Sequence, residues 1–458
     1  MVKPLPTSLL ESLKTIAGFD PDSFIAVHAS QEQVTSIRIN ASKFSMAKSE
    51  FLIQEKIPWT SSGYYLAQRP SFTFDPLFHA GCYYVQEASS MFLEQALMQL
   101  VDLAEPLKVL DLCAAPGGKS THIQSLISPD SLLVSNEIIK ARSNVLIDNI
   151  MKWGCNNVIV TNNDPSAFKA LQGYFDVMVV DAPCSGSGLF RKDEEAIDEW
   201  SLNNVQLCCQ RQQRILADSL PALKENGILI YSTCSYSREE DEDIADWLVN
   251  ELEMENVELS IEDEWSIVTS ISEKTNSKGC RFYPDKIKGE GFFLSCFRKS
   301  SGEGSNKKSR IAKPETASAK EKSIIHPWLK QSNLEIIKGR ALYHAIPVSL
   351  VADYSFINTV LNVRYFGVGI GQIMKDKLVP EHSLALSTII SDKIPVNELS
   401  YEEAIKYLQR QDFNFDGSGK GWGLVSYKGY SLGWVNVLAN RINNYYPKEL
   451  RILKQTRD

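Results

Sequence analysis

Apolar and polar positions in the middle of the chain follow a repeating pattern of short apolar runs and longer amphipathic segments. The apolar runs lie at 107–112, 132–137 and 158–162, and helical periodicity begins at Lys119 and spans 141–153. Runs of this length that alternate with helical patterns are typical of parallel strands covered on both faces. The sequence therefore predicts an α/β fold with a doubly wound, mostly parallel sheet and right-handed crossovers.

Two further apolar runs end on a polar turn that contains a cysteine. VMVVDAPCSGSG at 177–188 places Asp181 and Cys184 after a buried strand, and GILIYSTCS at 227–235 places Cys234 in the same position. Ligands of open α/β sheets bind outside the carboxyl ends of the strands, so these side chains are expected to face a substrate. A later run, GEGFFLSCF at 289–297, is predicted to be an edge strand.

A glycine-rich segment, DLCAAPGGKSTH at 111–122, follows the first strand and opens a helix. Gly117 and Gly118 allow backbone N–H groups to approach a ligand closely. The segment matches neither GxxxxGK[ST] nor GxGxxG, so it is not a standard phosphate or dinucleotide loop. Glu137 lies 20 residues after Gly117, an offset suited to ribose hydroxyls, and Asp164 is suited to an adenine amino group. The alternative is a turn that only allows close packing.

The flanking regions predict separate modules around the central domain. Residues 1–95 predict a small α+β domain, in which Arg38 and Asn40 share one face of a strand at 35–40, suited to phosphate contacts or to plain solvent exposure. The catalytic domain is expected at 96–299. A Ser-, Lys- and Gly-rich stretch at 300–323 predicts a flexible basic linker. Residues 324–458 predict a separate β-rich module, with short strands and glycine-rich turns from His326 onward.

The net charge of the chain is −8, but the charges are distributed unevenly along the sequence. The segment 239–264 holds 13 acidic residues and no Lys or Arg, which leaves +5 on the rest of the chain. Segments 298–322 and 420–458 are each basic by +5, which suits RNA contacts or a solvated surface. An apolar fraction of 43% without a long apolar run or a secretion signal predicts a cytoplasmic protein. Nine cysteines without CxxC spacing favour free thiols and no zinc site.

The motifs DLCAAPGGKS, NEIIKAR, DAPCSGSG, YSTCS and RFYP…GEGFF, in this order, resemble the Sun/RsmF family of RNA cytosine-C5 methyltransferases. TSIRIN and HAGCYYVQEASSM resemble the N-terminal RNA-binding part of that family, and GWGLVSYKGYSLGW…YYPKELR resembles the PUA-like module of its RsmF branch. Departures occur at Asp241, where the family often has Asn, and at Asp285, where it has His. The resemblance implies a Rossmann-like methyltransferase sheet with S-adenosylmethionine bound by Cys113, Ala114, Ala115, Pro116, Gly117, Gly118, Lys119, Glu137, Arg142, Asp164 and Asp181.

The same resemblance implies roles for the two thiols. Cytosine C5 is a poor nucleophile, and addition of a thiolate to C6 activates it. The resemblance makes Cys234 that nucleophile, Cys184 the group that promotes release, and Asp181 the partner of the cytosine N3/N4 edge. Lys119, in the glycine-rich segment, is expected to lie close by, where its charge would lower the pKa of a thiol. The other seven cysteines are expected to be small buried side chains.

The target base must leave a stacked helix or belong to a flexible strand, so flanking modules that hold RNA are expected. Phe282 and Tyr283 suit either base stacking or the core. The implied substrate is 16S rRNA or the 30S subunit, with neither membrane nor metal and with the protein as a monomer. Three alternatives remain open at this point: a tRNA cytosine-C5 methyltransferase, a non-catalytic ribosome assembly factor, and a small-molecule methyltransferase.

Overall fold

The centre of the molecule is a ten-stranded mixed sheet covered by helices. The computed structural model describes residues 3–30, 32–46, 49–300, 313–330, 333–413, 420–439 and 441–454. The sheet order is β11-β12-β13-β9-β8-β5-β6-β7-β16, and β10 pairs with β13. Its parallel part confirms the predicted α/β fold and consists of β5 (Lys108–Asp111), β6 (Leu132–Asn136), β7 (Val158–Thr161), β8 (Phe175–Asp181) and β9 (Leu223–Thr233).

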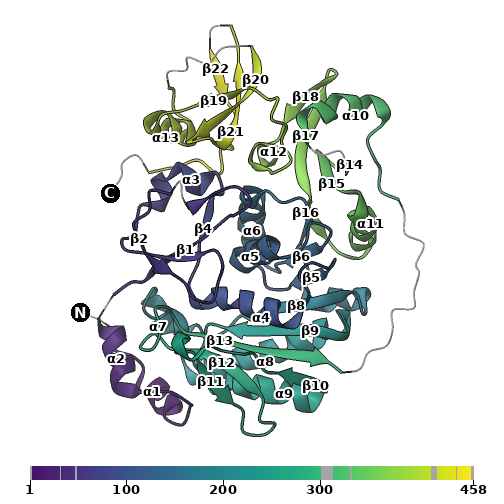
Figure 1. Ribbon diagram of the computed structural model, residues 1–458. Coiled ribbons are helices and arrows are strands. Elements are labelled where there is room, and N and C mark those ends of the chain that lie inside the picture. The colour runs from purple at the N-terminus through teal and green to yellow at the C-terminus, as the bar shows by residue number, and fades with distance from the viewer. Residues whose placement is uncertain are drawn as a thin grey trace.

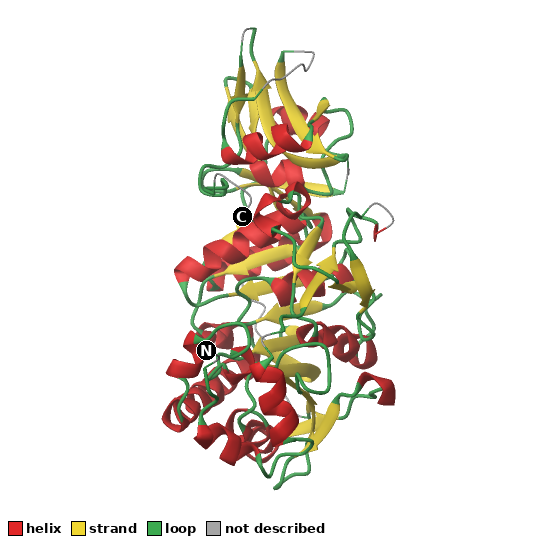
Figure 2. Cartoon of the chain, turned by 90° about the vertical axis from the view of Figure 1, so that its left-hand side faces the viewer, coloured by secondary structure: helices red, strands yellow, loops and turns green. Residues whose placement is uncertain are grey.

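Successive residues of the parallel strands enter two different cores, one on each face of the sheet. Val109 packs with helices on one face, whereas Leu110 packs on the other. Helices therefore lie on both sides of the strands (Figure 2). The first face is covered by α4 (Leu93–Leu100), α5 (Gly118–Leu126) and α6 (Lys140–Trp153), and the second by α8 (Leu202–Ser219), α9 (Glu242–Leu252) and α11 (Val351–Val360).

At the antiparallel end of the sheet, the prediction of an edge strand at 289–297 is wrong. The strand expected at the edge, β13 (Phe292–Lys299), lies inside the sheet between β9 and β12 (Lys278–Phe282). Both faces of β13 are covered, since neighbouring Phe293 and Leu294 are each buried in a different core. The remaining strands at this end are β11 (Val268–Ile271) and β10 (Met254–Val257). Phe282 and Tyr283 are both 1% exposed, so of the two predicted roles the structure supports core packing.

The N-terminal part contains a four-stranded sheet that is attached to the central domain by Arg38 and Asn40. Both residues are buried, which contradicts the two roles predicted for them at the surface. The Arg38 guanidinium donates to Gln86 Oε1 at 2.8 Å and to Thr121 Oγ1 of α5 at 2.6 Å, and Asn40 donates to the Trp153 carbonyl at 3.0 Å. The elements are α1 (Thr7–Leu13), α2 (Pro21–Ala29), β1 (Thr35–Ile39), β2 (Ile53–Lys56), β3 (Gly63–Leu66), α3 (Pro76–His79) and β4 (Tyr83–Val85).

The region after the central domain is less separate than the sequence predicts. Strand β16 (Val363–Phe366) pairs with β7 and extends the central sheet, and helix α11 completes its second core. Residues 301–312 of the predicted linker lie outside the described residues, and the end of that linker forms helix α10 (Ala319–Ile325), begun by a Ser318 capping box. The other elements are β14 (Leu334–Lys338), β15 (Tyr343–Pro347), β17 (Val368–Met374), β18 (Lys377–Pro380) and α12 (His382–Leu386).

The two ends of the chain share one core. Apolar residues of β1, α3 and β4 pack in a single cluster with residues of α13 (Tyr401–Gln409), β20 (Gly421–Tyr427) and β21 (Tyr430–Val437). The Tyr401 hydroxyl donates to the Phe74 carbonyl at 3.0 Å, and α13 lies beside α3 (Figure 1). Strands β19 (Val396–Glu398) and β22 (Ile442–Asn444) complete this C-terminal sheet.

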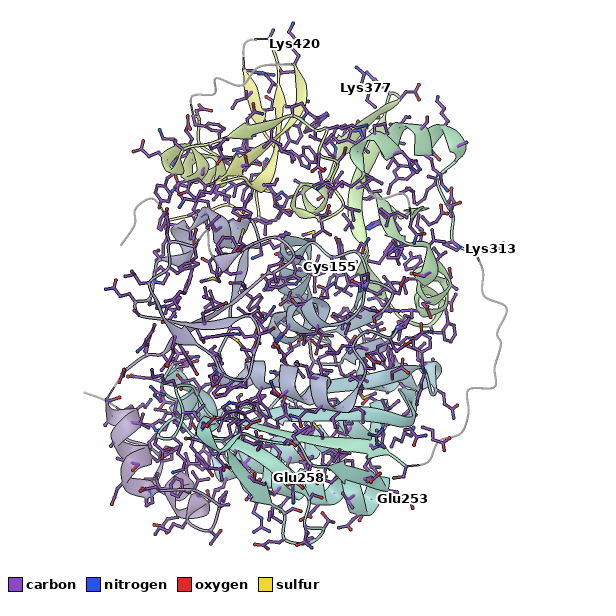
Figure 3. All side chains as sticks on the ribbon, in the orientation of Figure 1. Cys155, Glu253, Glu258, Lys313, Lys377 and Lys420 are labelled. Atoms are coloured by element: carbon purple, nitrogen blue, oxygen red, sulfur yellow. The ribbon has the colours of Figure 1, made fainter. Side chains whose placement is uncertain are left out.

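Charge is distributed unevenly over the molecule. Glu253 and Glu258 of the acidic segment lie at the opposite end of the molecule from Lys377 and Lys420 (Figure 3). In the described ranges, no helix has the length and apolarity needed to cross a bilayer. The same ranges hold no group of three or more His, Cys, Asp or Glu side chains arranged to bind a metal ion.

Candidate active site

The two cysteines singled out in the sequence meet at the carboxyl end of the central sheet. Strands β8 and β9 are parallel neighbours, and Asp181 pairs in register with Ser232. Each strand ends one to three residues before its cysteine, so the two turns lie side by side. The sulfur atoms of Cys184 and Cys234 are 3.0 Å apart, within hydrogen-bonding distance and without a covalent bond. The hydrogen bond to Cys234, together with burial, raises the pKa of Cys184 well above its ordinary value.

Asp181 has two partners at the end of β8. Its carboxylate accepts a hydrogen bond from Ser232 Oγ at 2.9 Å and forms an ion pair with Lys119 Nζ at 2.7 Å. Lys119 comes from the first turn of α5, so this ion pair joins the glycine-rich segment to the cysteine turns. The sequence suggested that Lys119 lowers a thiol pKa; its ammonium is instead held by Asp181, and the pKa of Cys184 is raised.

A buried carboxylate that the sequence analysis did not single out connects the two cysteine turns. Glu240 accepts hydrogen bonds from the Ser185 backbone N–H at 2.8 Å, the Ser185 hydroxyl at 2.5 Å and the Ser235 hydroxyl at 2.6 Å. Ser185 and Ser235 are the residues that directly follow the two cysteines. Burial raises the pKa of Glu240, and these hydrogen bonds oppose that effect. Glu240 thus fixes the separation between the two turns.

The next two acidic residues, Asp241 and Glu242, form ion pairs with a buried arginine beside the same two turns. Arg281 is 1% exposed and binds both carboxylate oxygens of Glu242, at 2.6 and 2.5 Å, as well as Asp241 at 3.0 Å. It also donates to the Tyr236 carbonyl at 3.0 Å, two residues after Cys234. In the sequence these acids belong to the acidic run at 239–264, for which no role was predicted. The sequence signal that could have identified them is their position shortly after the strand that ends at Cys234.

The glycine-rich segment borders a cavity of about 180 Å³ that opens beside Asp181. Gly117 has a left-handed backbone (φ 113°), which favours glycine, and it precedes the first turn of α5. A side chain at Gly118 would come within 3.4 Å of Tyr84 of the N-terminal part. Of the predicted cofactor residues, the cavity wall includes Cys113, Ala114, Ala115, Pro116, Gly118, Lys119 and Asp181.

The other predicted cofactor residues, Gly117, Glu137, Arg142 and Asp164, are not part of the wall of that cavity. Glu137 follows β6 and is 3% exposed; its carboxylate accepts from the Ile139 backbone N–H at 2.9 Å and lies 3.6 Å from Arg142. Arg142 also donates to the Ala115 carbonyl at 2.8 Å, which ties the acid to the glycine-rich segment. Asp164 follows β7 and accepts from the backbone N–H and hydroxyl of Ser166 at 3.0 and 2.6 Å.

Three family models match consecutive parts of the chain. The model for the 16S rRNA methyltransferase RsmB/F matches residues 98–298, that for the N-terminal domain of 16S rRNA methyltransferase RsmF matches 5–88, and that for the methyltransferase RsmF PUA domain matches 394–452. A relative from Psychromonas ingrahamii named ribosomal RNA small subunit methyltransferase F is 31% identical, covering 94% of this chain and 93% of its own. One of the same name from Vibrio vulnificus is 30% identical over 97% of both chains.

Solved structures resemble the chain over its central part. A methyltransferase homolog protein from Pyrococcus horikoshii superposes with a TM-score of 0.51 at 29% identity, covering 64% of this chain and 100% of its own. NSun6 from the same organism, solved with SFG, an analogue of S-adenosylmethionine, gives a TM-score of 0.54 at 20% identity over 66% of this chain and 100% of its own.

Fold and matches together define an S-adenosylmethionine-dependent methyltransferase that acts on ribosomal RNA. With its N-terminal domain, catalytic domain and PUA domain all matched, the chain belongs to the RsmF family of 16S rRNA methyltransferases.

Proposed function

We propose that the chain methylates C5 of a cytosine in 16S rRNA through a covalent adduct between Cys234 and C6 of the base. The observation that carries the proposal is the 3.0 Å separation of the Cys184 and Cys234 sulfur atoms at adjoining strand ends. A binding protein gains nothing from two thiols held together at a ligand site. A small-molecule enzyme would have no use for the two flanking domains that the family models match.

The cofactor site follows from the glycine-rich segment. Methyltransferases of this family use S-adenosylmethionine, whose sulfonium group carries the methyl group as an electrophilic carbon. We place it against Cys113 to Lys119, with Glu137 at the ribose hydroxyls and Asp164 at the adenine. The fit rests on the cavity beside Asp181 and on the Glu137 carboxylate, which Arg142 and the Ile139 N–H hold next to this segment. The boundary between this catalytic domain and the RNA-guiding modules is proposed near residues 95 and 299.

The reaction assigns a different task to each thiol. The Cys234 thiolate would form a bond to C6, and the electron pair of the C5–C6 double bond moves onto C5. C5 would then take the methyl group as the S–CH3 bond of the donor breaks and its electron pair stays on the sulfur, which leaves as a neutral thioether. The C5 proton then leaves to water, the C6–S bond breaks, and the double bond returns. Cys184 keeps its proton because its pKa is raised, so its S–H donates a hydrogen bond to the departing Cys234 sulfur. Asp181 contacts the N3/N4 edge of the base.

The test compares the two thiols on a denaturing gel with labelled 16S rRNA and cofactor. Cys184→Ala should form the adduct and release it slowly, so that protein crosslinked to RNA accumulates, whereas Cys234→Ala should give neither product nor adduct. Cys184→Ser is the matched control, because its hydroxyl can still donate to the departing sulfur and should restore part of the release rate. Adduct in Cys234→Ala and none in Cys184→Ala would reverse the two roles. Label in tRNA instead of 16S rRNA would reject the substrate.

A further inference from the structure

A second cavity, of about 400 Å³, lies between helix α2, helix α7 (Glu195–Glu199) and the loop that follows Cys184. We call it the α2–α7 cavity. Its wall includes Lys3, His28, Arg191, Lys192 and Ile197. Pockets for small ligands span roughly 300 to 1,000 Å³, so this cavity is large enough for one nucleotide. None of the residues assigned above to the thiol chemistry or to the cofactor lines it.

The α2–α7 cavity and the two thiols share one loop of the chain. The Gly188 backbone N–H donates to the Cys234 carbonyl at 2.8 Å. A side chain at Gly188 would meet that carbonyl at 2.7 Å, so the loop lies directly against the cysteine turn. Phe190, which lines the cavity, packs in one cluster with Tyr236, two residues after Cys234. A ligand in this cavity is therefore a neighbour of the base held at the thiols.

The wall of the α2–α7 cavity is cationic. Three cations, Lys3, Arg191 and Lys192, and one acid, Glu194, line it. Lys3 is paired with Asp198, and burial lowers the pKa of His28. Lys192 is exposed and makes no ion pair with any residue in the described part of the chain. The wall thus has the sign of charge that binds a phosphate.

Arg191 adds an observation of a different kind. Its side chain is only 5% exposed, and its Nε–H has no hydrogen-bond partner among the residues that the structure describes. The rest of the guanidinium donates to the Gly289 carbonyl at 3.1 Å and to the Glu32 carbonyl, and it lies 3.6 Å from Glu290. A buried donor without a partner is costly, so the Arg191 guanidinium keeps one unused donor that an anionic oxygen would satisfy.

We propose that the α2–α7 cavity binds the nucleotide next to the target cytosine, with its phosphate held by Arg191 and Lys192. The inference rests on the proposed function, because a base taken out of its stack needs the adjoining backbone to be fixed nearby. Apolar Leu5 and Ile197 on the same wall suit the sugar and base of that nucleotide. Helices α1 and α2 then form one side of the RNA-binding surface.

The test is phosphate-ethylation interference on a 16S rRNA transcript, with wild type, Lys192→Ala and Lys274→Ala. Lys274, an exposed lysine of the same domain between β11 and β12, is the matched control because it does not line the cavity. Wild type should show interference at phosphates beside the methylated cytosine, and Lys192→Ala should lose one of them. Its slope of log affinity against log salt should also fall by about one, as for the loss of one phosphate contact. Lys274→Ala should match wild type.

Different results would reject the nucleotide site in the α2–α7 cavity and the proposed function. An unchanged interference pattern and an unchanged salt slope in Lys192→Ala, with methylation at cytosine C5 intact, would overturn the α2–α7 cavity as a nucleotide site. Wild-type protein that fails to bind the transcript, or that methylates another position, would instead reject the proposed function. Because Lys192 is exposed, its replacement does not disturb the core, and the fold of the variant can be checked by circular dichroism.

Discussion

Replacement of Arg38 by methionine separates a structural role from an RNA contact. The Arg38 guanidinium is fully buried and binds Gln86 of the N-terminal part and the first turn of α5, the helix that follows the glycine-rich segment. Arg38 also lies over the Trp153 ring, 4.4 Å from its centroid. We expect Arg38→Met to weaken binding of S-adenosylmethionine, since the first turn of α5 loses its attachment.

The expected change in the free energy of unfolding of Arg38→Met follows from two opposing effects. The bonds to Gln86 Oε1 and Thr121 Oγ1 are charge-assisted, and two such bonds stabilise the fold by about 3 to 6 kcal/mol. Burial lowers the pKa of Arg38 to about 9. This decrease of the pKa from 12.5 means that burial disfavours the charged guanidinium by roughly 5 kcal/mol. Methionine removes both effects, so the free energy of unfolding should change by less than about 2 kcal/mol. Alanine also leaves a void and should cost about 2 to 4 kcal/mol more.

The assay combines urea unfolding, calorimetry with S-adenosylmethionine and RNA binding. We expect Arg38→Met to retain most of its stability and its RNA affinity, while cofactor affinity falls about tenfold, equivalent to about 1.4 kcal/mol. Arg364→Met is the control, because among the described residues the Arg364 guanidinium donates to Ser143 and Asn144 of α6 and not to α5. Loss of RNA affinity with unchanged cofactor affinity would refute the reasoning and restore the surface role that the sequence suggested.

Three other carboxylates give separate predictions. Glu137→Ala should lower S-adenosylmethionine affinity about 10- to 150-fold in calorimetry, since a charge-assisted acceptor for the ribose is lost; unchanged affinity would remove Glu137 from the site. Glu240→Ala leaves the buried Ser185 N–H without an acceptor and should slow adduct formation in single-turnover assays while cofactor affinity stays unchanged. Burial raises the pKa of Asp111 to about 7, so its contribution to stability is full below its ordinary pKa of 3.8 and is lost as the pH rises through 7. Asp111→Asn should remove roughly 4 kcal/mol of this pH dependence in urea unfolding, and a difference from wild type that stays constant with pH would contradict the assignment.

The parallel strands and both thiols could be predicted because their signals are local. A short apolar run that ends in a polar turn indicates a strand and its carboxyl end without any knowledge of its neighbours. The interior place of β13 and the addition of β16 to the sheet depend on pairing with strands far away in the sequence, Leu223–Thr233 and Val158–Thr161. Periodicity along one segment contains no information about such partners.

The errors at single polar residues have a related cause. Arg38 on an alternating strand suggests a solvent-facing cation, and only the approach of α5, more than 80 residues later, surrounds it with acceptors. Glu240 belongs to an acidic run in the sequence, whereas the fold buries it between two serine hydroxyls. Both are polar groups whose burial is possible only when distant segments satisfy them.

The shared core of the two chain ends has a consequence for synthesis on the ribosome. Ile37, Tyr83 and their neighbours pack against Tyr407, Leu432 and Val435, which are translated more than 300 residues later. At elongation rates of about 5 to 20 residues per second, that interval is roughly 15 to 60 s. During it the N-terminal sheet has an apolar face without its cover. The apolar face of the N-terminal sheet is therefore covered only after residues 401–437 have emerged from the ribosome.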